Sequence, residues 1–212
     1  TCRSACDRLD RHPDLTFTKG DAWSYEQVEK VDPALFQRIG KHIESGRWSI
    51  VGGWWIQPDC NIPAGESYVR QALYGQHYFR AKFGVTATTG YNVDSFGHNG
   101  MLPQILRQAG LNSYVFLRPM PHELGLPGRL FWWEAADGSR VLAFRIPFEY
   151  CSWGKDLEQH IRLKLASGAD LSDSSAINQV VDGVNGTDLT LSNLSATLDA
   201  GQTMGPTQLS ID

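Results

Sequence analysis

The segment Gly90-Tyr-Asn-Val-Asp-Ser-Phe-Gly-His-Asn-Gly100 decides the fold class of this 212-residue chain. A strand-like run from Val85 to Val93 leads to a single acidic residue, Asp94, and a glycine-flanked turn then opens a helix near Met101. Open and closed α/β folds place their chemistry at the carboxyl ends of strands. We therefore interpret Asp94 as a candidate catalytic residue at such an edge.

The same order of strand and helix continues on both sides of this segment. The expected strands cover residues 15–19, 47–51, 85–93 and 113–117, and the expected helices cover 25–30, 33–44, 66–83 and 102–109. Asp32 and Pro33 suit the N-cap and first position of the helix over 33–44. In the helix over 66–83, the expected buried residues are Val69, Leu73, Phe79 and Phe83.

A β-hairpin is expected near residues 130–146, because two strand-like runs flank the turn-forming pair Asp137-Gly138. The complete pattern predicts an α/β fold built of parallel β/α units with right-handed crossovers, followed by this hairpin. Residues 10–162 are the expected domain. Residues 1–9 show no usable pattern, and residues 163–212 form a low-aromatic tail that we interpret as disordered or frame-shifted sequence.

Composition excludes several classes of partner. The formal net charge is −4 with no basic run, which argues against nucleic acid and anionic membranes. No apolar run approaches the ~20 residues of a membrane span, and no signal peptide is visible, so we expect a cytoplasmic location. The four cysteines lack Cys-x-x-Cys spacing, which favours free thiols in a reducing compartment over a metal site.

Residues that follow the expected strands are acids, amides, indoles and an arginine, without a glycine-rich phosphate loop. They are Asp21, Trp23, Trp54, Trp55, Gln57, Asp59, Asn61, Asp94, Phe96, His98, Arg118, His122 and Glu123. Aromatic faces beside carboxylates and amides suit a sugar, whose CH faces stack on rings while its hydroxyls bond to polar groups. Two carboxylates at such a site also suit glycoside cleavage.

Several of these residues have a second interpretation. Trp54 and Trp55 are substrate-binding candidates, with core packing as the alternative. Asp59 binds substrate or caps a turn. His98 is interpreted as a hydrogen-bonded supporting residue rather than a metal ligand. Arg118 at a strand end is a binding candidate, and a surface arginine is its alternative.

The run from Val93 to Gly110 closely resembles the motif of glycoside hydrolase family 38, the zinc-dependent α-mannosidases. Residues Gly46–Asn61 and Glu66–Gln71 are similar to the same family, and Phe131–Arg140 resembles its bacterial branch. The resemblance covers roughly residues 10–160. It implies that the expected α/β fold is part of a seven-stranded β/α barrel that hydrolyses α-mannosides in glycans with retention of configuration.

The resemblance also implies roles for individual residues. Asp94 is the implied nucleophile and a zinc ligand, Phe96 would line the mannose subsite, and Arg118 would sit beside the nucleophile. The other implied zinc ligands are a His-x-Asp pair on the first strand and a histidine further downstream. We expect most of these ligands to be missing from this chain, which would then be inactive alone. Glu149 and Asp156 are eligible as the acid/base residue by position only.

Two alternatives remain open. A polysaccharide deacetylase-like metal hydrolase uses acids and histidines at the same edge of a related barrel, but it needs a His-x-x-x-His pair that this sequence lacks. A non-catalytic carbohydrate-binding remnant of the same scaffold would bind glycans without turnover.

Overall fold

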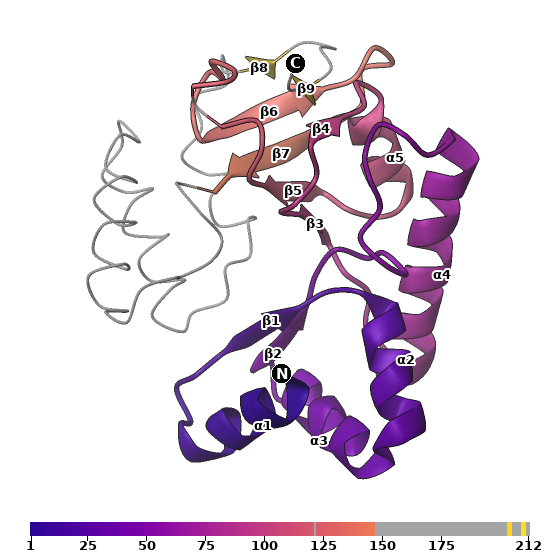
Figure 1. The fold of residues 1–212 in the computed structure, drawn as a ribbon, viewed down its shortest axis with the longest axis vertical. Coiled ribbons are helices and arrows are strands. Elements are labelled where there is room, and N and C mark those ends of the chain that lie inside the picture. The colour runs from indigo at the N-terminus through magenta and orange to yellow at the C-terminus, as the bar shows by residue number, and fades with distance from the viewer. Residues whose placement is uncertain (121, 147–202, 205–208, 211–212) are drawn as a thin grey trace.

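The computed structural model describes residues 1–120, 122–146, 203–204 and 209–210 (Figure 1). The predicted helices and strands occur in the predicted order and the predicted hairpin follows, with α1 (Cys2–Arg11) and β4 (Gly97–His98) as additional elements. The helices are α1 (Cys2–Arg11), α2 (Ala22–Val31), α3 (Pro33–Glu44), α4 (Gly65–Phe83) and α5 (Leu102–Gln108). The strands are β1 (Phe17–Lys19), β2 (Trp48–Ile50), β3 (Thr89–Asn92), β4 (Gly97–His98), β5 (Ser113–Phe116), β6 (Leu130–Glu134), β7 (Arg140–Arg145), β8 (Thr203–Met204) and β9 (Leu209–Ser210).

Local capping explains why α3 matches its prediction at both ends. The Asp32 carboxylate accepts a hydrogen bond from the Leu35 backbone N–H at 3.0 Å, and Pro33 occupies the first turn. Gly46 follows the helix with φ of 75°, a left-handed conformation that glycine adopts at little cost. The buried stripe of α3 is formed by Leu35, Ile39, His42 and Ile43.

The strands form parallel units and one antiparallel hairpin. β1 and β2 are a parallel pair, and the larger sheet has the order β3-β5-β7-β6-β8, in which β3, β5 and β7 run parallel. β6 and β7 are antiparallel around a turn with Gly138 at φ 81°, as Asp137-Gly138 predicted. A backbone bond of 2.8 Å from Gly52 N–H to the Thr89 carbonyl joins the end of β2 to the start of β3. The described residues form a mixed α/β fold, and the seven-stranded barrel stays a prediction.

Helix α4 runs alongside both the β1–β2 region and the larger sheet (Figure 1). Its Phe79 packs with α1, α2 and α3, whereas its Tyr68 and Ala72 pack with α5 and the larger sheet. Gly75 lies between them, where the loop after β2 touches the helix backbone: a Cβ there would lie 2.4 Å from both the Gly53 oxygen and the Trp54 carbonyl carbon. The glycine is therefore required by this close approach.

The predicted core face of α4 was partly wrong. Phe79 is fully buried, but Val69 and Leu73 are 45% and 60% exposed. The buried positions are Tyr68, Ala72, Gly75 and Phe79, whose spacing follows one face of a helix. Val69 and Leu73 belong to the neighbouring stripe, which lines an open groove beside α5.

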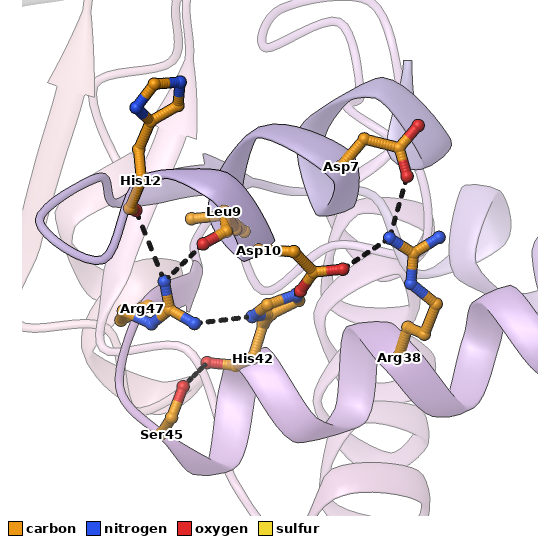
Figure 2. Close-up of polar contacts among 8 residues, drawn as sticks. All are labelled: Asp7, Leu9, Asp10, His12, Arg38, His42, Ser45 and Arg47. Atoms are coloured by element: carbon orange, nitrogen blue, oxygen red, sulfur yellow. Dashed lines mark hydrogen bonds and ion pairs between the residues drawn. The ribbon is translucent and has the colours of Figure 1, made fainter.

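Residues 1–9, for which no element was predicted, lie largely in α1. Ala5, Cys6 and Leu9 are buried against α3. The buried side chains are mostly small, so the apolar pattern in the sequence is weak. Polar contacts complete the packing (Figure 2): Arg38 on α3 donates to the carboxylates of Asp7 and Asp10 at 2.8 and 2.7 Å.

The buried imidazole of His42 joins α1 to the chain after α3 (Figure 2). Its Nδ1 accepts from the Arg47 guanidinium at 3.3 Å, so Nε2 carries the proton and donates to Asp10 at 2.9 Å. Arg47 also donates to the Leu9 carbonyl at 2.7 Å. Over the described residues, none of the helices has the length and apolarity that crossing a membrane requires.

Candidate active site

Asp94 lies in the turn that connects β3 to β4, just beyond the carboxyl end of β3 (Figure 1). Its side chain is exposed, and no described residue donates a hydrogen bond or forms an ion pair with it. Asp94 is thus free to face a ligand.

The backbone on either side of Asp94 is held by side chains from the loop after β2. Asn92 is fully buried; its oxygen accepts from Trp54 Nε1 at 2.7 Å, and its Nδ2 donates to the Pro58 carbonyl at 3.0 Å. Val93 N–H donates to the Gln57 side chain at 3.3 Å. These bonds fix the direction in which the chain leaves β3. They therefore fix the backbone position of Asp94, the next residue.

Asp21, at the end of β1, supports the same loop. Its carboxylate accepts from the Gln57 backbone N–H at 2.9 Å, and burial raises its pKa. It is also a non-glycine residue with positive φ, 61°, a conformation that costs free energy and recurs at functional sites. The ends of β1, β2 and β3 therefore meet around one turn, as parallel β/α units require.

Phe96 and Arg118 come together beside this turn. The Arg118 guanidinium carbon lies 4.9 Å from the centroid of the Phe96 ring, a cation–π contact. Phe96 is 61% exposed, which is unusual for a phenylalanine, and Arg118 Nε is buried without a hydrogen-bond partner. An exposed ring two residues after an unpaired carboxylate, with a guanidinium held against it, is suited to contact a ligand.

His98 is a supporting residue, as the sequence interpretation favoured. Its Nε2 donates to the Arg118 carbonyl at 2.8 Å, and its Nδ1 accepts from the Tyr114 hydroxyl at 2.9 Å. Complete burial lowers its pKa to about 4, so the ring is neutral at ordinary pH. Since both ring nitrogens are occupied, His98 has no lone pair for a metal.

The other predicted substrate-binding residues occupy different places. Trp54 is fully buried against Tyr68, which is at odds with stacking on a sugar, since no face of its ring is open. Trp55 is half-buried against the cluster that contains Phe79, with its ring edge-on to Tyr78 at 5.9 Å between centroids. The exposed Asp59 accepts from the Asn61 and Ile62 backbone N–H groups at 2.8 and 2.9 Å, which is the turn-capping alternative. Substrate roles for Trp55 and Asp59 stay predictions.

Sequence reasoning missed the group that packs beneath Asp94. Cys60 is buried with its sulfur 3.3 Å from both the Tyr68 hydroxyl and the Ser95 hydroxyl, and desolvation raises its thiol pKa. Its sulfur also lies 3.3 Å from Asn92 Nδ2. The only signal was position, because Cys60 follows the aromatic loop and carries no motif. Cys2, Cys6 and Cys60 are free thiols, and Cys151 lies outside the described residues.

The described residues do not fit the zinc ion that the resemblance implies. Among residues 1–120 and 122–146, no group of three or more His, Cys, Asp or Glu side chains could hold a metal ion, whereas a catalytic zinc needs three protein ligands. One His-x-Asp tripeptide precedes Asp94, at His12-Pro-Asp14, but it lies before the amino end of β1. Asp94 follows the opposite, carboxyl end of a strand. Glu149 and Asp156 lie outside the described residues.

Comparisons with known proteins agree on the family. The model of the glycosyl hydrolases family 38 N-terminal domain matches residues 1–199. The chain is 33% identical over 152 residues to Alpha-mannosidase G of Dictyostelium discoideum and 34% identical over 140 residues to Alpha-mannosidase 2C1 of Homo sapiens. These alignments cover 71% and 66% of the chain, but only 14% of each relative.

The fold is similar to the crystal structure of an alpha-mannosidase from Enterococcus faecalis V583. The TM-score is 0.75 at 20% sequence identity, with 96% of this chain and 27% of that chain covered. The similarity of fold and the match to the family model together identify a glycoside hydrolase domain. The chain belongs to glycoside hydrolase family 38, which confirms the resemblance seen in the sequence. The matched range includes residues 1–9 and most of the tail, the two segments left without an assignment.

Proposed function

We propose that this chain carries the nucleophile-bearing part of a retaining glycosidase that cleaves α-mannosidic bonds in glycans. The single observation that supports this most strongly is the exposed, unpaired carboxylate of Asp94 beyond the carboxyl end of β3, in the same turn as Phe96, whose ring contacts Arg118. Family membership and the named α-mannosidase relatives support the substrate class.

In the proposed reaction, an Asp94 carboxylate oxygen attacks the anomeric carbon of the mannoside. The bond from that carbon to the glycosidic oxygen breaks, and the leaving oxygen takes a proton from an acid outside the described residues. Water then attacks the same carbon and gives its proton to the conjugate base of that acid. The bond from the anomeric carbon to the Asp94 oxygen breaks, which frees the carboxylate and gives mannose with its original configuration. Two displacements at one carbon restore the starting stereochemistry.

Phe96 and Arg118 have complementary tasks in this proposal. The exposed Phe96 ring offers an apolar face to the CH groups of the sugar, while the Arg118 guanidinium places a fixed positive charge against the turn that carries Asp94.

Other predictions from the sequence go with this proposal. A seven-stranded barrel is supported by the likeness of fold to the Enterococcus faecalis enzyme and by the parallel β3, β5 and β7. Zinc assistance remains a prediction through which we derive no step, because the described residues provide one carboxylate, Asp94. A domain over residues 10–162 and a cytoplasmic location also stay predictions.

The nucleophile assignment is tested by changing Asp94 to Asn in a version of the protein extended to the length of a complete catalytic domain. We expect release of nitrophenol from an aryl α-mannoside to fall by on the order of 10⁴-fold or more, since the amide cannot form the glycosyl ester. A fluorinated mannosyl fluoride, which slows the second step, should label the peptide that contains Asp94.

Asp137→Asn is the matched control, because Asp137 is an exposed turn aspartate on the hairpin. Its amide oxygen can still accept from the Ser139 N–H and its amide nitrogen can donate to the Ser139 hydroxyl, so only the exposed bond from Gln104 is lost. Its turnover should equal that of the unchanged protein. Retained turnover in Asp94→Asn would remove Asp94 from the nucleophile role. Binding of α-mannosides without any turnover in the extended protein would instead support the non-catalytic carbohydrate-binding alternative.

A further inference from the structure

A continuous line of buried hydrogen bonds runs beneath the Asp94 turn and ends at the Arg118 backbone. It begins at Cys60, whose sulfur contacts the Tyr114 hydroxyl at 3.7 Å. Tyr114 contacts His98 at 2.9 Å, and His98 reaches the Arg118 carbonyl at 2.8 Å. Tyr114 and His98 are both fully buried, so water does not compete for these bonds.

The donor and acceptor of each hydrogen bond follow from the group at the end of the line, the Arg118 carbonyl. A carbonyl oxygen can only accept, so His98 Nε2 must carry the hydrogen toward Arg118. In a neutral ring Nδ1 is then an acceptor, and the Tyr114 hydroxyl donates to it. The Arg118 carbonyl therefore selects one tautomer of His98, and the Tyr114 hydroxyl complements that tautomer by donating to Nδ1.

Arg118 is fixed at two points by the segment that carries Asp94. His98 binds its carbonyl, and the ring of Phe96, two residues before His98, lies under its guanidinium at 4.9 Å. Asp94 is two residues before Phe96. The segment from Asp94 to His98 thus presents a carboxylate, a ring and a backbone anchor in succession, and the anchor sets the position of the arginine.

We propose that His98, supported at Nδ1 by Tyr114, is a positioning residue that holds Arg118 against Phe96 in the segment that carries Asp94. This inference rests on the proposed function of Asp94. It adds a residue that acts through Arg118 and does not touch the substrate itself. Its role is geometric, so a side chain that keeps the donor to the Arg118 carbonyl should preserve it.

Two substitutions at His98 separate this role from simple packing. Glutamine can place its amide N–H near the position of Nε2 and keep the bond to the Arg118 carbonyl. Asparagine is shorter, and its polar atoms reach only the position of Nδ1, so that bond is lost. Tyr68→Phe is the matched control, because Tyr68 is a buried tyrosine whose hydroxyl contacts the same Cys60 sulfur but which is not bonded to His98.

The first readout is nuclear magnetic resonance on the 212-residue chain, which needs no turnover. In the unchanged chain, the nitrogen shifts of His98 should report a neutral Nε2–H ring at neutral pH. The Arg118 Nε–H signal should carry a ring-current shift that disappears in Phe96→Leu. That shift should persist in His98→Gln and Tyr68→Phe and collapse in His98→Asn.

The second readout is kinetic, in the extended protein. His98→Asn should lower kcat by about 10- to 100-fold with a smaller change in KM, as removal of an orienting residue does, while His98→Gln stays within a few-fold of the unchanged protein. An Nδ1–H or charged His98 in the unchanged chain would overturn the inference even if a variant failed to fold. So would an Arg118 signal that is the same in His98→Asn and His98→Gln. Failure of the Asp94→Asn test with these NMR results intact would reject the proposed function alone.

Discussion

At the scale of single residues, Asp94 is defined more by its neighbours than by its own contacts. Asn92 and Gln57 hold the backbone before it, and His98 anchors the segment after it. Each of these bonds is buried or half-buried, whereas the carboxylate between them is exposed. The turn is thus rigid at both ends and open in the middle, which is the arrangement that a nucleophile needs for attack on an incoming substrate.

Burial of His98 predicts a pH dependence of stability. Its pKa is about 4 in the folded chain against an ordinary value of 6.5, so on acidification the unfolded chain binds a proton first. The contribution to the free energy of unfolding is complete above pH 6.5. It is lost as pH falls toward 4, at up to about 1.4 kcal/mol per pH unit. Urea denaturation across this range measures it.

His98→Gln is the control for this dependence, because glutamine does not titrate. The difference in free energy of unfolding between the two proteins should shrink as the pH falls, since only the unchanged chain loses this contribution. Parallel pH profiles for both proteins would show that His98 titrates normally and would contradict its assignment as a neutral, buried ring.

At the scale of elements, the position of α4 is set by one contact with the loop after β2. Gly75 allows the backbone at Gly53 and Trp54 to touch the helix, and the Trp55 N–H donates to the Gln71 carbonyl at 2.8 Å. The loop that supports Asn92 is therefore fastened to the longest helix. A change at this contact should therefore also alter the candidate site, because Trp54 donates a hydrogen bond to Asn92.

Gly75→Ala should lower the free energy of unfolding by at least about 1–3 kcal/mol, because the added methyl group meets backbone atoms that cannot rotate away. Gly65→Ala, in the same helix, is the control: nothing lies within 4 Å of its Cβ position, and alanine favours helix. Its stability should be unchanged or higher by up to about 1 kcal/mol. Equal stability of the two variants in thermal or chemical denaturation would refute the close-contact argument.

Helix α1 provides a comparison between apolar and ionic contacts. Leu9→Ala should lower the free energy of unfolding by about 2–5 kcal/mol, because Leu9 is fully buried. Asp7→Ala should cost less than about 1 kcal/mol, because Asp7 is partly exposed and Arg38 keeps its bond to Asp10. Guanidinium denaturation of both variants measures the difference. A larger loss in Asp7→Ala would mean that the ion pairs of Figure 2, rather than apolar packing, hold α1 to α3.

At the scale of the whole molecule, two clusters of buried side chains are joined through α4 and Ile50, which packs against both. The cluster around the larger sheet supports the Asp94 turn, and the cluster of α1, α2 and α3 supports β1 and β2. The turn that carries Asp94 therefore depends on both clusters. The chain spans 14% of the length of each of the two curated relatives compared.

The scattered positions of the described His, Cys, Asp and Glu side chains predict weak zinc binding by the 212-residue chain. Over its described residues no metal-binding group of three side chains exists, and Asp94 contributes one carboxylate. Calorimetric titration with Zn²⁺ should show no tight stoichiometric binding, and Asp94→Asn should remove what weak binding there is near the turn. Tight binding at one ion per chain would demonstrate a site that the two clusters do not reveal.

The sequence alone determined those features that depend on a few neighbouring residues. Asp32-Pro33 and Gly46 fixed the ends of α3, Asp137-Gly138 fixed the hairpin, and the run from Val93 to Gly110 identified the family. Caps and turns are local, because their hydrogen bonds and backbone angles involve residues close in the chain.

Only the tertiary structure decided which side chains face a ligand and which face the core. Trp54 is buried, as its core-packing alternative has it, Leu73 is exposed against its prediction, and Phe96 meets Arg118 across 22 positions of sequence. The line from Cys60 through Tyr114 and His98 joins a loop and two strands that no local pattern relates. Burial depends on what packs from the other side, and that partner is set by the path of the whole chain.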